Sequence, residues 1–100
     1  METIILICEN VECANKLEEE ARRLGYNIKF EVQEATNIVN KISIDDIKNA
    51  KAVLFALNRR MEDIEDIERF IDIEYYEVEP IMAINNSKQV IQEIISDLNK

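Results

Sequence analysis

The chain contains no histidine and no tryptophan, and its 100 residues include one glycine, one proline and two cysteines. Without histidine, the chain lacks the usual physiological acid–base group and one of the two common zinc ligands. The scarcity of glycine and proline argues against long linkers and disordered arms. No apolar run approaches the roughly 20 residues that a membrane-spanning helix requires. These absences predict a globular protein with no metal, no organic cofactor and no direct membrane insertion.

The charge of the chain is strongly acidic. It has 21 aspartate and glutamate residues against 12 lysines and arginines, which gives a formal net charge of −9. Such a charge repels a phosphate backbone, so we expect no nucleic-acid partner. The N-terminus begins Met1-Glu2-Thr3, with an acid where a signal peptide would have a basic region. Two cysteines without an export signal are expected to be free thiols, which predicts a cytoplasmic protein.

Four segments have the composition of β-strands. Residues 3–8 and 52–57 are continuous apolar runs, which are typical of strands buried on both faces of a sheet. Residues 27–33 and 73–78 alternate polar and apolar side chains, which is typical of edge strands with one exposed face. The connection at residues 34–41 is predicted to be a loop.

Apolar residues at helical spacing mark the segments between the strands. The clearest is residues 11–24, with Asn10 as the expected N-cap and Gly25 as the expected left-handed residue after its end. Ser43 is expected to cap a second, short helix through a capping box with Asp46. This short helix is predicted over residues 44–49, and two further segments are predicted to be helical, residues 59–70 and 90–98.

Strands that alternate with helices favour an α/β fold with a parallel sheet. A length of 100 residues fits one domain spanning residues 1–100. If the apolar strands are central and the alternating strands are at the edges, the sheet is flavodoxin-like, open and four-stranded, with the order 2-1-3-4. Ligands of such sheets bind where neighbouring connections diverge, here between the first and third strands. This switch point would bring residues 8–12 close to Asn58, Arg59 and Arg60.

Cys8 is the candidate nucleophile at this switch point. A thiol beside a helix N-terminus and facing arginines would favour the thiolate and an anionic ligand. Glu9 and Glu12 argue against this, because two carboxylates would raise the pKa of the thiol and repel a phosphoryl group. The alternative is that Cys8 fills the end of a buried strand, as free cysteine commonly does. The residues alone leave both interpretations open.

Several segments, in the same order and at the expected spacing, resemble a known family. They are LEEEARRLGYNIKFEVQ at 17–33, NIVNKISIDDI at 37–47, AKAVLFA at 50–56, IERF at 67–70 and YEV at 76–78. Together they resemble the fructose-type enzyme IIB domain of the bacterial sugar phosphotransferase system. The resemblance implies a four-stranded parallel sheet flanked by helices, in agreement with the pattern of apolar residues.

The resemblance also implies a function as a phosphocarrier. Family members accept a phosphoryl group from a histidine of a IIA partner onto a cysteine that follows the first strand, and pass it to a sugar bound in a membrane IIC partner. By position, Cys8 matches that cysteine. The backbone N–H groups of Asn10, Val11 and Glu12 would then hold the phosphate, and Arg59 and Arg60 would be its charge partners.

The loop that follows Cys8 departs from the family pattern. The family sequence resembles C-P-T-G-x-A-H-T, whereas this chain has the shorter run C-E-N-V-E-C at residues 8–13, without the proline, threonine, glycine and histidine. Phosphoryl transfer depends on such positioning groups. Two functions therefore remain: a IIB-like phosphocarrier, which the family favours, or an inactive IIB-like domain that acts as a binding or regulatory module.

Overall fold

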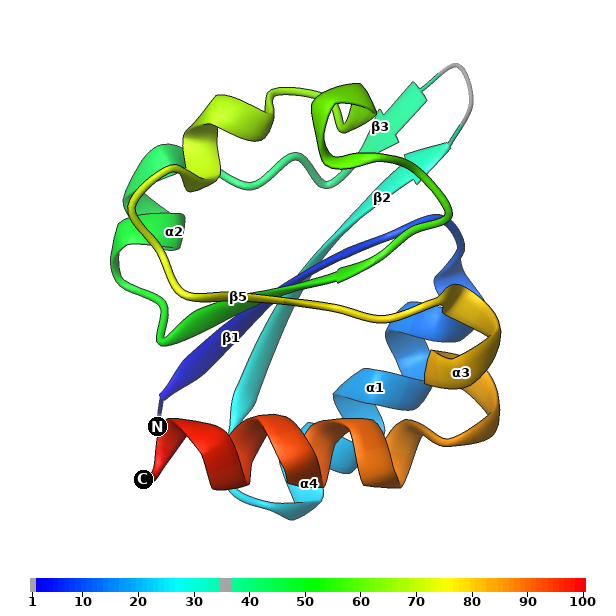
Figure 1. The fold of residues 1–100 in the computed structure, drawn as a ribbon, viewed down its shortest axis with the longest axis vertical. Helices are drawn as coiled ribbons and strands as arrows, with labels where there is room; N and C mark the ends of the chain where they lie inside the picture. The colour runs from blue at the N-terminus through cyan, green and yellow to red at the C-terminus, as the bar shows by residue number, and fades with distance from the viewer. Residues whose placement is uncertain (1, 35–36) are drawn as a thin grey trace.

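The computed structural model describes residues 2–34 and 37–100 as a five-stranded sheet with helices on both faces (Figure 1). The sheet has the order β3-β2-β1-β4-β5. Its strands are β1 (Thr3–Cys8), β2 (Asn27–Glu34), β3 (Asn37–Val39), β4 (Ala52–Ala56) and β5 (Tyr75–Glu77). The helices are α1 (Val11–Arg23), α2 (Ile44–Lys48), α3 (Pro80–Asn85) and α4 (Ser87–Leu98), with the 3₁₀ turns η1 (Met61–Asp63) and η2 (Ile67–Phe70).

The predicted order of the four parallel strands is confirmed. β2, β1, β4 and β5 are neighbours in that order, and each adjacent pair runs parallel. The prediction was wrong at one edge, because residues 34–41 are not only a loop: β3 forms there and pairs antiparallel with β2. β2 is therefore an inner strand, although its alternating pattern predicted an edge.

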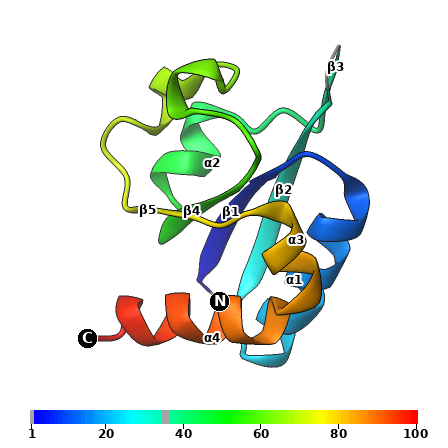
Figure 2. The same cartoon turned by 45° about the vertical axis from the view of Figure 1, so that its right-hand side comes forward.

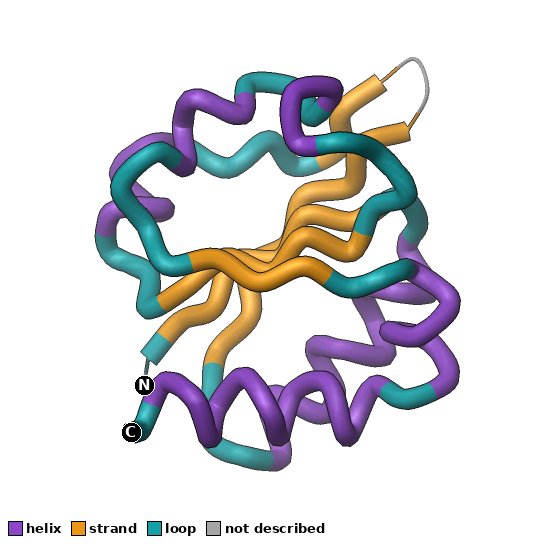
Figure 3. The backbone as a smooth tube through the Cα atoms, viewed as in Figure 1, coloured by secondary structure: helices purple, strands orange, loops and turns teal. Residues whose placement is uncertain are grey.

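Helices cover the two faces of the sheet unequally. α1, α3 and α4 pack on one face, against alternate strand residues such as Ile4, Leu6 and Leu54. The other face carries Ile5, Ile7 and Phe55, and it is covered by the short α2 and the segment with η1 and η2. Figures 2 and 3 show this second layer as short turns and loops, in contrast to the regular helices of the first.

One helix prediction required correction, and one helix was not predicted. Residues 59–70, predicted as one helix, form the separate turns η1 and η2. Asp66, immediately before η2, has φ of +53°, a left-handed conformation that interrupts a right-handed helix. α3 was not predicted from the sequence; it begins at Pro80, where proline is favoured because the first helical residue needs no intrahelical N–H bond.

The predicted caps of the first two helices are confirmed. The Asn10 side chain accepts a hydrogen bond of 2.8 Å from the N–H of Cys13, and the Ser43 hydroxyl accepts one of 3.2 Å from the N–H of Asp46. Gly25, after the end of α1, has φ of +83°. These local features fix where each helix begins or ends. Among the helices within the described residues, none has the length and apolar character needed to cross a membrane.

Replacing Gly25 tests the left-handed turn after α1. A Cβ at this position would meet no atom within 4 Å, so the cost of Gly25→Ala comes from the backbone conformation alone. We expect Gly25→Ala to lower the free energy of unfolding by about 1 kcal/mol, and Gly25→Asn to lower it less, because asparagine tolerates the left-handed region better. Urea unfolding measures both variants. Equal losses for alanine and asparagine would contradict this explanation.

Candidate functional site

The carboxyl end of β1 meets the connection after β4, as the predicted topology requires. Cys8 is the last residue of β1 and lies between Val32 of β2 and Ala56 of β4. The carboxylate of Glu9 accepts a hydrogen bond of 2.6 Å from the backbone N–H of Asn58. The two connections therefore make direct contact across the switch point, and an acidic side chain forms that contact.

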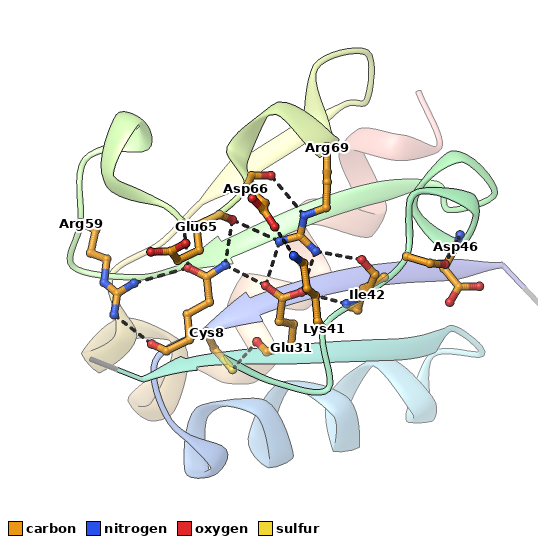
Figure 4. A network of polar contacts seen from close by, with 11 residues as sticks. Cys8, Glu31, Lys41, Ile42, Asp46, Arg59, Glu65, Asp66 and Arg69 are labelled. Carbon is orange, nitrogen blue, oxygen red and sulfur yellow. Dashed lines mark hydrogen bonds and ion pairs between the residues drawn. The ribbon is translucent and has the colours of Figure 1, made fainter. Parts of the chain in front are cut away.

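The Cys8 thiol is completely buried. Its Sγ atom lies 3.4 Å from the carbonyl oxygen of Asn10 and 3.6 Å from that of Glu31, and its one proton can be donated to either (Figure 4 shows the contact with Glu31). The pKa of Cys8 is raised to about 12, first by burial and then by the nearby Cys13 and Glu31, while hydrogen bonds with the backbone of Asn10 and Ala14 lower it in part. A thiol in this state is protonated at neutral pH and is a poor nucleophile.

The expected upward shift of the Cys8 pKa is confirmed in direction, but its main cause is burial rather than Glu9 and Glu12. Those two carboxylates act instead on Cys13, whose pKa is raised to about 11 by burial first and then by both acids. Cys13 is also a buried free thiol, on the first turn of α1. Both cysteines are therefore held in the unreactive, protonated form.

The three residues predicted to hold a phosphate through their N–H groups lie at the start of α1. Asn10, Val11 and Glu12 are exposed there, in the N-terminal turn of a 13-residue helix. Free N–H groups at such a turn attract anions. In this chain the Asn10 side chain already accepts from one of these free N–H groups, that of Cys13. The turn also carries the negative charge of Glu12, which opposes the binding of an anion.

The two arginines expected as charge partners both bind other acceptors. Arg59 donates to the carbonyl oxygen of Gln33 at 2.9 Å and to its side-chain oxygen at 3.4 Å, which fixes the guanidinium at the end of β2 (Figure 4). The Arg60 side chain is 80% exposed and lies 3.6 Å from carboxylates of Glu62 and Asp63. The topology brings the connection after β4 to the switch point, but the guanidinium groups of its two arginines bind acceptors within the chain.

A buried polar network lies next to Cys8 and was not predicted from the sequence (Figure 4). Glu31 on β2 is fully buried and pairs with Arg69 of η2 through two hydrogen bonds of 2.8 and 3.0 Å. The Glu31 carboxylate also accepts from the N–H of Ile42 at 2.8 Å and from the side chain of Gln33 at 2.7 Å. Arg69 donates in addition to the carbonyl oxygen of Ile42. The network joins β2 to two segments distant in sequence.

The network sets the charge state of Glu31. Burial alone would raise the pKa of this carboxyl, but hydrogen bonds from Arg69, Gln33 and Ile42, together with the charge of Arg69, outweigh burial and lower the pKa below its usual value. Glu31 is therefore ionised and fully paired. The alternating pattern of residues 27–33 concealed this, because polar side chains at alternate positions normally indicate an exposed face.

With this geometry established, comparisons with known proteins decide the family. A family model described as "PTS system, Lactose/Cellobiose specific IIB subunit" matches residues 12–93. The chain belongs to the enzyme IIB family of the sugar phosphotransferase system. The match begins at residue 12, after Cys8, so it covers the scaffold and leaves the cysteine outside.

Individual relatives support a fructose-type member of the enzyme IIB family. "PTS system fructose-like EIIB component 1" of Escherichia coli K12 is 36% identical over 81 residues, which are 81% of this chain and 72% of that protein. The "Fructose-like PTS system EIIBC component" of the same organism is 33% identical over 81 residues, but the chain spans only 17% of its length. The solved structure of a domain from the fructose-specific IIABC component of Borrelia burgdorferi is 32% identical, has a TM-score of 0.83, and is matched over 95% of this chain and 94% of that one.

Removing Arg69 should strongly destabilise this IIB-type domain. Arg69→Ala leaves the Glu31 carboxylate buried without its partner, and we expect the free energy of unfolding to fall by about 3–5 kcal/mol. Arg69→Ala combined with Glu31→Gln should be more stable than Arg69→Ala alone, because the unpaired charge is then absent. Urea unfolding measures both. Arg22→Ala, which removes a surface arginine 3.5 Å from Glu18, is the matched control and should change stability little.

The ion pair between Glu31 and Arg69 also predicts that the stability of the fold depends on pH. The pKa of Glu31 is lower in the folded protein than in the unfolded chain, so its stabilisation is present above about pH 4.3 and is lost as the pH falls through the folded pKa. We expect the acid-induced loss of stability to be shallower in the Arg69→Ala, Glu31→Gln double variant than in the wild type. Parallel acid titrations followed by circular dichroism would show the difference, and superimposable curves would contradict it.

The buried thiols should react very slowly in the folded protein. With a pKa of about 12 for Cys8 against roughly 8.5 for a free cysteine, its thiolate population at neutral pH is lower by about a thousandfold or more. We expect negligible modification by a disulfide reagent such as DTNB in buffer and complete modification in concentrated urea. The variants Cys8→Ala and Cys13→Ala assign each thiol. Rapid reaction of Cys8 in the folded Cys13→Ala variant would contradict the burial seen here.

Proposed function

We propose that the chain serves in a sugar phosphotransferase system as a IIB-type domain that binds its partner components and regulates them without carrying a phosphoryl group. The observation that supports this best is the complete burial of the protonated Cys8 thiol. A phosphoryl acceptor must reach the donor and must lose its proton when the sulfur–phosphorus bond forms. In the described conformation the thiol is buried out of reach of a donor, and burial disfavours its ionised form.

The connection after Cys8 supports the same proposal. Phosphoryl transfer relies almost entirely on positioning and on charge stabilisation by preorganised donors. Here the Asn58 N–H binds the carboxylate of Glu9 and the Cys13 N–H binds the Asn10 side chain. These donors already have partners within the chain, and a carboxylate occupies the space between the two connections. An incoming dianion would have to displace that carboxylate.

The partners we propose are the IIA and membrane IIC components of such a system. Membership in the IIB family supports both, and the E. coli relative named as an EIIBC component supports the IIC partner. The chain has retained the sheet, the switch point and the layer of helices around it. A docking surface can survive on this scaffold while the chemistry of the loop is lost.

The second candidate is the phosphocarrier, which the position of Cys8 favours. Cys8 ends the central strand β1, beside the start of α1. In that reaction the thiol loses its proton, the sulfur–phosphorus bond forms, and the nitrogen–phosphorus bond of a IIA phosphohistidine breaks. The backbone N–H groups of Asn10, Val11 and Glu12 and the guanidinium groups of Arg59 and Arg60 would stabilise the phosphoryl group. The loop would first have to open and expose the thiol.

Phosphorylation and binding measurements separate the two functions. The chain is incubated with phosphoenolpyruvate, the general phosphotransfer proteins and a fructose-type IIA, and its intact mass is then measured. We expect no gain of a phosphoryl group, while E. coli fructose-like EIIB component 1, treated in parallel, gains one. Titration calorimetry with the same IIA should show binding that Cys8→Ala leaves unchanged.

Each other outcome of these measurements overturns the proposal. A phosphoryl gain that Cys8→Ala abolishes would establish the phosphocarrier. The absence of both phosphorylation and IIA binding would reject both functions in a system of this type.

A further inference from the structure

A groove of about 500 Å³ lies between α2 and the chain that leads from η2 to β5, and its lining comes from within residues 44–51 and 68–74. Figures 1 and 2 show these two segments side by side, over the face of the sheet that carries no long helix. Lys51 precedes β4 and Glu74 precedes β5, so the groove reaches the amino ends of these strands. Cys8 is at the carboxyl end of β1, and the groove is therefore separate from the switch point.

The groove has an apolar interior and exposed apolar side chains beside it. The buried Ile47 and the partly buried Ile73 line it together with Ala50. Ile44 and Ile71 line it as well, and their exposed fractions are 51% and 75%. Exposed isoleucines that adjoin an apolar groove form a contiguous patch, which is typical of an interaction surface.

The two sides of the groove carry opposite charges. Lys48 and Lys51 line it on the side of α2 and the connection to β4. Three acids line the opposite side, formed by η2 and the connection to β5: Glu68, Asp72 and Glu74. Arg69 also belongs to this second side, but Glu31 binds its guanidinium group. The groove therefore has one cationic and one anionic side.

Most of these charges have no partner of opposite sign in the part of the chain that the structure describes. Lys48 and the three acids take part in none of its ion pairs, and Lys51 has one exposed contact of 3.8 Å with Glu2. The same two segments do pair where they come close, because Lys41, before α2, binds Asp66, before η2. Along the groove itself, the charges remain available to a second molecule.

This arrangement is complementary to a second copy of itself. A two-fold axis that runs along the groove, between Ile71 and the groove floor, sets each Ile71 into the groove of the other copy. The neighbouring Asp72 then approaches Lys48 of that copy. A two-fold axis across the groove would instead bring the two acidic sides together, which is unfavourable. A two-fold contact uses the same residues twice and closes at two copies.

We propose that two copies of this chain associate through the groove, with Ile71 of each copy buried against Ile47 and Ile73 of the other and Asp72 paired with Lys48. The apolar contact supplies the driving force, and the charges set the orientation. The net charge of −9 on each copy opposes association at long range. At physiological salt the Debye length is about 8 Å, so distant charges are screened while the contacting pairs still attract. The switch point stays outside this contact, so the proposal does not depend on the function proposed above.

Sedimentation equilibrium of the whole chain tests the association. At about 0.15 M salt and from about 10 µM to 1 mM protein, a range suited to small, weak interfaces, we expect the mean mass to rise from that of a monomer toward that of a dimer. Ile71→Ser should weaken the association about tenfold or more, because each dimer loses two buried isoleucine side chains. Ile81→Ser, at an exposed position of α3 over the other face of the sheet, is the matched control and should change nothing.

A wild-type chain that stays monomeric throughout this range would overturn the proposal and leave the groove to a partner of another kind. A dimer that Ile71→Ser does not weaken would also overturn it, because the copies would then meet through another surface, such as the edge strand β5. Circular dichroism of both serine variants checks that they remain folded. None of these results bears on IIA binding or phosphorylation.

Exchanging charges tests the two-fold arrangement. Lys48→Glu and Asp72→Lys should each weaken self-association, because each sets like charges against one another at both contacts of the dimer. An equimolar mixture of the two variants should associate as strongly as the wild type, since both contacts of the mixed dimer then join opposite charges. Asp72→Lys also lowers the net negative charge of each copy, so general charge repulsion predicts stronger association for this variant. Stronger association of Asp72→Lys, or no recovery in the mixture, would contradict the proposed contact.

Discussion

The ion pair between Glu31 and Arg69 holds together the half of the molecule that has the least regular structure. A buried carboxylate is costly unless it is paired and hydrogen-bonded, and Glu31 satisfies this requirement with Arg69, Gln33 and the N–H of Ile42. The segment carrying η1 and η2 lacks a regular helix to pack on the sheet, so the pair supplies a specific anchor for it. Because the Glu31 backbone carbonyl also accepts from the Cys8 thiol, the same residue connects this anchor to Cys8 at the switch point.

The sequence predicted those parts of the fold that follow from local pattern. The apolar runs gave the central strands β1 and β4, and Asn10, Ser43 and Gly25 marked helix ends correctly because caps depend on neighbouring residues. The errors arose where distant residues decide the structure. β2 looked like an edge strand because its polar residues were read as exposed. They are buried because β3 covers one side of the strand and η2 supplies an arginine.

For the candidate site, too, the sequence predicted which segments meet but not which side chains pair. Topology alone brought Cys8 close to the connection after β4, and the contact between Glu9 and Asn58 confirms that meeting. The destinations of the arginines could not be predicted, because a long flexible side chain binds the best acceptor that tertiary structure offers. For Arg59 that acceptor is the carbonyl of Gln33, at a strand end whose surroundings depend on β3. The order of the strands can be predicted from the pattern of apolar residues. The partners of long polar side chains can be predicted only when the tertiary structure is known.

The polar groups around Cys8 have hydrogen-bond partners within the chain itself. This explains how a IIB-type scaffold can persist without the family loop. The Glu9 carboxylate accepts from the backbone N–H of Asn58, the Asn10 side chain accepts from the backbone N–H of Cys13, and the Cys8 thiol has two backbone carbonyls within reach of its one proton. A phosphoryl group entering here would have to displace these hydrogen bonds before it could use the same donors. The groups that would otherwise hold a phosphate instead stabilise the closed turn. The closed turn therefore pairs its own polar groups without the glycine and hydroxyls of the family loop.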